Sequence, residues 1–218
     1  AAAMVFPSLR EDGPVLALIR ERARRGAPFR ALEPRRRAAL RLDAPALPPN
    51  KTQRKQWRRL GEEGALAFRL IDRPDAVRDA AERFLALETA GWKGDVGTAM
   101  LQEPGDAAFA RVALRQMARR GRCRIAELTL DGAPVALAVL LVQGRAAMYW
   151  KIAHDPRYDR FSPGVQLTLR LTEALRAEGA LDLVDSCAVE GHAMIESLWP
   201  ERIAIVDAAV SLPRRETA

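Results

Sequence analysis

The stretch from residue 123 to residue 153 contains three short apolar runs separated by two-residue turn signals. The runs cover residues 123–130, 134–142 and 146–153, and the dipeptides Asp131-Gly132 and Gln143-Gly144 stand between them. Such dipeptides favour tight hairpin turns, because glycine adopts positive φ angles at no steric cost. The pattern therefore predicts an antiparallel meander of three strands, which excludes an all-helical fold.

Helical patterns lie on both sides of this meander. Upstream, residues 65–72 are predicted as a strand, followed by helices over residues 74–90 and 106–119. Downstream, Pro163 begins a predicted helix over residues 163–177, before a strand at 181–186, a brief helix at 193–198 and a last strand at 202–210. A meander followed by a strand–helix–strand crossover predicts an α/β (α+β) fold, with a mixed, mostly antiparallel sheet flanked by helices.

The second upstream helix carries a further expectation about its buried side. Its periodicity places apolar and long side chains along one side, namely Phe109, Val112, Ala113, Gln116 and Met117.

The first 60 residues differ from the rest in order and in charge. Pro14 precedes a short predicted helix that ends before Gly26, whereas residues 44–50 contain three prolines, which excludes a helix and marks a linker. We therefore expect a domain boundary there, with an N-terminal extension at 1–50 and the main domain at 51–218. Residues 51–63 resume a basic helical pattern, with Trp57 and Leu60 on one face.

The formal net charge is +7, and much of the excess arginine and lysine lies in these first 60 residues. Such a stretch could attract nucleic acid, anionic lipid or a phosphorylated ligand, but biased codon usage that enriches arginine and alanine is the favoured explanation. No nucleic-acid-binding motif accompanies the charge, so nucleic acid is the least favoured partner.

Cysteine usage and hydropathy bound the cellular setting. Cys123 and Cys187 lie far apart without a CxxC pair, which argues against a disulfide framework and a structural zinc site, so no metal is expected. No apolar run reaches the roughly 18 residues that a membrane-spanning helix needs. We expect a cytoplasmic protein, and the sequence leaves its oligomeric state open.

The order of elements and several short motifs resemble the GNAT acyltransferases. In detail they look like the CelD-like branch, which is associated with cellulose or polysaccharide biosynthesis and is distantly similar to the FemAB aminoacyltransferases. The motifs that carry the resemblance are Phe84-Leu85-Ala86-Leu87-Glu88, Gly91-Trp92-Lys93-Gly94, Gly97-Thr98, Ser162-Pro163-Gly164, Asp185-Ser186-Cys187-Ala188, His192 and Trp199.

The resemblance implies an enzyme that transfers an acetyl or acyl group from acyl-coenzyme A to an amine or hydroxyl of a small molecule or saccharide, in envelope polysaccharide metabolism. Members of this branch commonly carry two lobes in tandem, so the resemblance also implies that residues 1–50 are the remnant of a preceding lobe and its linker. The alternative function is a non-catalytic GNAT-like binding module.

A helix start supplies the candidate cofactor corner, because its unpaired backbone N–H groups bind phosphate. Ser162, Gly164 and Val165 form this start, and Arg157 and Arg160 upstream are candidates for the coenzyme phosphates. The family signature is a basic or amide residue followed by xxGxG/A, whereas this chain has Arg160-Phe161-Ser162-Pro163-Gly164, with a proline and one glycine. An ordinary helix with proline in its first turn is the alternative.

The resemblance implies that the edge of the strand before this helix binds the pantetheine arm through strand-like hydrogen bonds. Strand alternation places Tyr149, a candidate cofactor contact, on the same face as Lys151, with Trp150 on the other face.

Acyl transfer needs a base for the acceptor, an acid for the departing thiolate and donors for the oxyanion. Trp92 and Lys93 are expected to border the acceptor, although a structural anchor is equally plausible for Trp92. An acyl-cysteine at Cys187 is disfavoured, since cysteines are commonly buried and inert. The candidate catalytic residues are Glu88, Lys151, His154, Asp185 and His192; for Lys151 and the histidines, a purely structural role is the alternative.

Overall fold

The computed structural model describes residues 3–26 and 28–211. One sheet of eight strands runs through the molecule in the order β1-β8-β2-β7-β6-β5-β4-β3. Every neighbouring pair is antiparallel except β6 and β7, which confirms the predicted mixed, mostly antiparallel sheet. The strands are β1 Ala3–Arg10, β2 Phe29–Arg41, β3 Leu66–Ile71, β4 Cys123–Leu130, β5 Ala133–Gln143, β6 Ala146–His154, β7 Leu183–Asp185 and β8 Glu201–Ser211.

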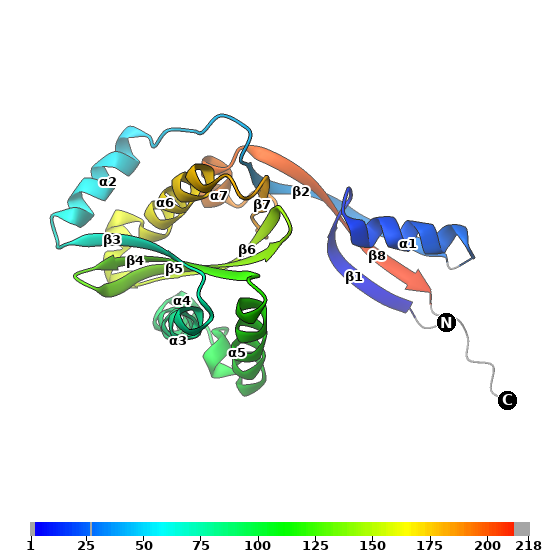
Figure 1. The fold of residues 1–218 in the computed structure, drawn as a ribbon, viewed down its shortest axis with the longest axis horizontal. Coiled ribbons are helices and arrows are strands. Elements are labelled where there is room, and N and C mark those ends of the chain that lie inside the picture. The colour runs from blue at the N-terminus through cyan, green and yellow to red at the C-terminus, as the bar shows by residue number, and fades with distance from the viewer. Residues whose placement is uncertain (1–2, 27, 212–218) are drawn as a thin grey trace.

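Helices cover both faces of the main part of this sheet (Figure 1). Helices α3 and α5 lie on one face, whereas α2, α6 and α7 lie on the other, and α1 lies against the arm formed by β1, β8 and the start of β2. The helices are α1 Pro14–Arg24, α2 Lys51–Gly61, α3 Pro74–Ala90, α4 Trp92–Asp95, α5 Pro104–Arg119, α6 Pro163–Glu178 and α7 Ala193–Leu198, with 3-10 turns η1 Met100–Gln102 and η2 Pro156–Phe161.

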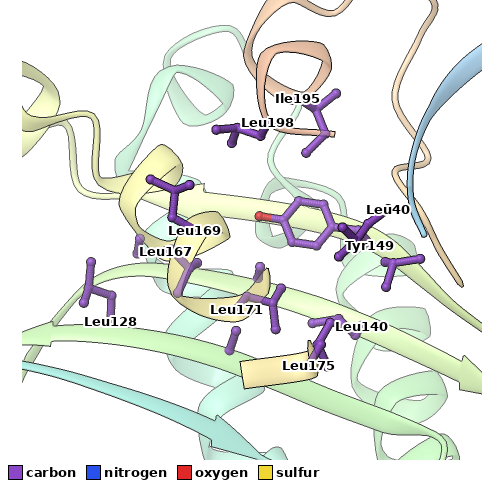
Figure 2. Packing of buried hydrophobic residues seen from close by; sticks show 14 of the residues in the cluster. Leu40, Leu128, Leu140, Tyr149, Leu167, Leu169, Leu171, Leu175, Ile195 and Leu198 are labelled. Carbon is purple, nitrogen blue, oxygen red and sulfur yellow. The ribbon is translucent and has the colours of Figure 1, made fainter. Parts of the chain in front are cut away.

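The larger core lies between the sheet and α6, where leucines surround Tyr149 (Figure 2). The ring of Trp199 meets that of Tyr149 edge to face at 5.3 Å, and its indole N–H donates to Thr172 Oγ1 at 3.0 Å. Helix α6 begins at Pro163, as predicted, and ends where Gly179 takes a φ of +65°. The apolar face of α6 thus holds its N-terminus against the middle of the sheet.

Helix α5 buries a different side from the one that the sequence predicted. Its buried residues are Ala107, Ala110, Leu114 and Ala118, whereas Phe109 and Val112 are 63% and 61% exposed. Small alanines allow α5 to approach α3 closely, so the larger apolar side chains stay outside the contact.

Two strands of the N-terminal region, β1 and β2, were not predicted from the sequence. Strand β2 lies between β8 and β7, and its Ala39 is paired with both Glu201 and Asp185. Ala38 and Leu40 belong to the α6-side core. The end of β2 is therefore part of the same sheet as the main domain, while the origin of residues 1–50 as the remnant of a preceding lobe stays a prediction.

None of the helices within residues 3–26 and 28–211 is both long and apolar enough to span a bilayer.

Candidate functional site

Strand β6 contains a β-bulge at the predicted site. Leu140 of β5 pairs with Tyr149 whereas Val139 pairs with Lys151, so Trp150 is an extra residue in β6. The bulge turns Tyr149 toward α6, where its hydroxyl lies 2.9 Å from Thr168 Oγ1. Lys151 points instead toward Glu88 of α3. The prediction that Tyr149 and Lys151 share a face is therefore wrong, because a bulge reverses the alternation of side chains.

Strands β6 and β7 separate just before this bulge. Their parallel pairing covers Ala146 to Met148 of β6, while the pairing of β6 with β5 continues to His154. The open half of the β6 edge borders a cavity of about 510 Å³, a size typical of ligand-binding clefts. Of the predicted site residues, it is lined by Trp92, Lys93, Tyr149, Lys151, His154, Ser162, Gly164, Val165 and His192.

The start of helix α6 forms one end of the cavity. Ser162 has a left-handed backbone with a φ of +52°, and its side chain does not cap the helix. The first intrahelical bond runs from Gln166 N–H to Ser162 O. Since Pro163 has no N–H, the first-turn donors are the N–H groups of Gly164 and Val165, which have no hydrogen-bond partner within residues 3–26 and 28–211. Both residues line the cavity. Such donors, together with the positive end of the helix dipole, suit a phosphate.

The two arginines expected at this corner have other partners. Arg157 forms an ion pair with Asp155, and Arg160 forms one with Glu63, at 2.6 Å and 2.8 Å. Neither arginine lines the cavity. Their role as phosphate ligands stays a prediction.

Glu88 of α3 forms hydrogen bonds to three segments on the α3 side of the cavity, namely α4, β6 and η1. Its Oε1 accepts from Lys93 Nζ at 2.9 Å and from Lys151 Nζ at 3.0 Å, and its Oε2 accepts from Met100 N–H at 3.0 Å. Burial raises the pKa of Glu88, but the Met100 N–H and the two ammonium groups outweigh it and hold the pKa below its usual value. Glu88 is therefore ionised near neutral pH and is a weak base.

We expect Glu88→Gln to lower stability at pH 7 by about 2 kcal/mol, because charge-assisted hydrogen bonds are lost from a buried site. A depressed folded-state pKa gives stability that is present above the unfolded pKa and is lost as pH falls through the folded value. Urea unfolding of Glu88→Gln should therefore show a shallower loss of stability below about pH 5 than the parent protein. The control is Glu82, which lies on α3 like Glu88 but forms an exposed ion pair with Arg111 of α5. Glu82→Gln should change stability by less than about 1 kcal/mol. Parallel pH curves for the parent and Glu88→Gln would contradict this assignment.

The two histidines occupy different settings. His154 Nε2 lies 2.7 Å from Asp159 Oδ1, and a methyl group built on Gly164 would lie 4.0 Å from its Nδ1. Asp159 thus orients the ring and leaves Nδ1 on the Gly164 side of the cavity. His192 is exposed at the cavity wall, just before α7. Only the geometry of His154 has the carboxylate–imidazole form that general bases use.

Asp185 is the last residue of β7 and Cys187 follows two residues later, and neither offers a reactive group to the cavity. Asp185 forms a buried ion pair with Arg37 and accepts the Cys187 N–H at 2.9 Å, and it does not line the cavity. Cys187 does line it, but burial, followed by the charge of Asp185, raises the pKa of its thiol to about 12. The thiol therefore stays protonated, which disfavours a nucleophilic role.

Sequence reasoning missed two polar residues of this region, Asp159 and Gln56. Asp159 lies five residues after His154, a spacing that acquires meaning only once η2 folds the chain back. Gln56 of α2 donates through Nε2 to Ser162 Oγ at 3.0 Å, a contact across 106 residues for which the sequence carries no local signal.

Comparisons with known proteins identify the family and the fold. The model of the acetyltransferase (GNAT) domain family matches residues 50–192. Among solved structures, the C-terminal DUF2156 domain of a "putative lysylphosphatidylglycerol synthetase" from Agrobacterium fabrum is 17% identical, with a TM-score of 0.62 over 97% of this chain and 69% of that one. FemX is 10% identical, with a TM-score of 0.60 over 96% and 72%. A conserved protein of unknown function from Bacteroides thetaiotaomicron is 14% identical, with a TM-score of 0.58 over 96% and 69%.

These structural likenesses concern the fold. A search of the curated proteins gave no match.

Proposed function

The chain belongs to the acetyltransferase (GNAT) domain family, and we propose that it transfers an acetyl or other acyl group from acyl-coenzyme A to an amine or a sugar-like hydroxyl. The observation that carries this proposal is the cavity between the separated strands β6 and β7, which ends at the uncapped start of α6.

Two features of the cavity fit acyl-coenzyme A. The free N–H groups of Gly164 and Val165 suit the pyrophosphate, and the open edge of β6 offers backbone groups to the amide-bearing pantetheine arm. In this arrangement Ser162, Gly164, Val165 and Tyr149 surround the coenzyme, while Trp92 and Lys93 border the acceptor on the α3 side. The remaining candidates, Arg157 and Arg160, would have to leave their carboxylate partners to take part.

We assign the general base to His154. The orienting hydrogen bond to Asp159 fixes the tautomer that leaves Nδ1 free to take a proton from the acceptor. Lys151, held between Glu88 and the cavity, is a candidate to donate a proton to the departing thiolate. His192 and Asp185 are weaker candidates, because one has no orienting contact among the described residues and the other is fully engaged by Arg37 and Cys187.

The finer features of the reaction rest on the sequence motifs. The motifs that resemble the CelD-like branch, of which Trp92 and Lys93 line the cavity, support a small-molecule or saccharide acceptor in envelope polysaccharide metabolism, used in the cytoplasm.

Calorimetry and turnover test the function directly. We expect acetyl-coenzyme A to bind at micromolar Kd, and the free thiol of coenzyme A to appear when a panel of amino sugars, sugars and amino acids is supplied. Binding without turnover of any acceptor would favour a non-catalytic GNAT-like module instead. Failure to bind acetyl-coenzyme A would overturn the proposal.

His154→Gln should lower kcat by about 100-fold or more, since general-base catalysis contributes about 100- to 10,000-fold. The Kd for acetyl-coenzyme A should change little, because the phosphate donors are backbone groups of α6. Asp159→Asn should lower kcat less and should flip the favoured tautomer. An unchanged kcat in a folded His154→Gln protein would rule out His154 as the base.

A further inference from the structure

The junction between η2 and α6 contains a polar contact from a helix that lies outside the cavity. Gln56 of α2 donates through Nε2 to Ser162 Oγ at 3.0 Å and, at 3.5 Å, to the carbonyl of Arg160. Both acceptors belong to the corner that the proposed function assigns to the coenzyme phosphates.

The position of Ser162 makes this contact informative. A serine just before a helix ordinarily caps it, because its hydroxyl accepts from the N–H of the second or third helical residue. With Pro163 as the first helical residue, those positions are Gly164 and Val165, whose N–H groups are the free donors that line the cavity. A self-capping Ser162 would compete with any phosphate for these donors.

Two features prevent this competition. Ser162 has a left-handed backbone with a φ of +52°, and its side chain makes no cap hydrogen bond to the helix; such a conformation is strained for a residue other than glycine. The hydrogen bond from Gln56 holds the hydroxyl in this arrangement. A non-glycine residue keeps a strained conformation only where its surroundings impose it. In the part of the chain that the structure describes, Gln56 is the side chain that hydrogen-bonds to this hydroxyl.

Helix α2 is firmly placed to do this. Its Leu60 is fully buried, the guanidinium of Arg170 on α6 stacks on Trp57 at 4.7 Å, and Gln166 Nε2 donates to the Gln53 carbonyl at 3.1 Å. A second contact to the same junction joins Glu63 and Arg160. Gln56 therefore approaches Ser162 from a rigid support.

We propose that Gln56 is a positioning residue, which diverts the Ser162 hydroxyl from the start of α6 and so keeps the Gly164 and Val165 N–H groups free for the phosphates of acyl-coenzyme A. This inference rests on the proposed function. It explains how α2 contributes to a cavity that its own side chains do not line.

The test compares two thioesters that differ in phosphate. Gln56→Leu should weaken binding of acetyl-coenzyme A by about fivefold to tenfold, the effect expected of one competing helix cap. Its kcat/KM with acetyl-pantetheine, which has no phosphate, should stay within about twofold of the parent value. Calorimetry gives the first quantity and thiol release gives the second.

Two further variants separate positioning from general loosening of α2. Gln53→Leu, which removes the capping box with Asn50 in the same helix, should lower Tm without changing the Kd for acetyl-coenzyme A. Ser162→Gly removes the hydroxyl, so adding Gln56→Leu to it should have almost no further effect on the Kd. Equal losses with both thioesters, or additive effects of Gln56→Leu and Ser162→Gly, would overturn this inference while leaving the proposed function intact. No binding by the parent protein would overturn the proposed function first.

Discussion

Replacing Gly164 by tryptophan is expected to weaken binding of acetyl-coenzyme A by about 100-fold or more, a loss of about 2.7 kcal/mol. A Cβ at this position would lie 3.3 Å from Ile152 Cδ1, 3.9 Å from Met194 Sδ and 4.0 Å from His154 Nδ1. All three residues line the cavity, so the indole would occupy the space between the β6 edge and the free N–H groups of α6. Calorimetry with acetyl-coenzyme A measures the effect.

A folding defect must be distinguished from a blocked site. Gly164→Ala adds one methyl group and should weaken binding only several-fold, and Ile152→Val removes the Cδ1 atom that this methyl group meets at 3.3 Å. The double variant Gly164→Ala with Ile152→Val should therefore have a Tm close to that of the parent protein and should recover most of the affinity for acetyl-coenzyme A. Parent-like affinity in a folded Gly164→Trp protein would show that the coenzyme binds elsewhere.

Much of the fold is predictable from the sequence because the residues that begin and end its helices and turns act locally. The turn at Asp131-Gly132 joins β4 and β5 as predicted, and the next turn lies one residue later than predicted, at Gly144-Arg145, because Gln143 still pairs with Ala146. Pro163 begins α6 as predicted. Turn dipeptides, prolines in first turns and glycines after helices act within a few residues. They can therefore be recognised in a single sequence and predict where turns and helices begin and end.

The features that escaped prediction depend on contacts between distant residues. Strand β2 is rich in arginine, and its Arg37 is buried. The charge of Arg37 is neutralised there by Asp185, which lies 148 residues away in the sequence. The bulge at Trp150 arises from the register of β6 against β5 and leaves no composition signal. The same holds for the candidate site, since the start of α6 beside Ser162 was predictable, whereas the partners that engage Arg157, Arg160 and Ser162 were not.

The buried pair of Arg37 and Asp185 carries the second large expected effect. The two side chains are 9% and 6% exposed, and they join β2 to β7 at the point where β7 separates from β6. Asp185→Ala should lower the free energy of unfolding by about 3–5 kcal/mol, because it leaves the Arg37 charge buried without a partner. Urea unfolding at pH 7 measures this loss.

The double variant Arg37→Met with Asp185→Leu decides what the pair does. Replacing both charges by apolar side chains of similar size should restore most of the stability, since the cost of a broken pair comes from the charge left behind. If Asp185 is structural, this double variant should also keep kcat within a few-fold of the parent value. A stable double variant whose kcat falls by 100-fold or more would instead return Asp185 to the catalytic role that its place at the end of β7 suggested.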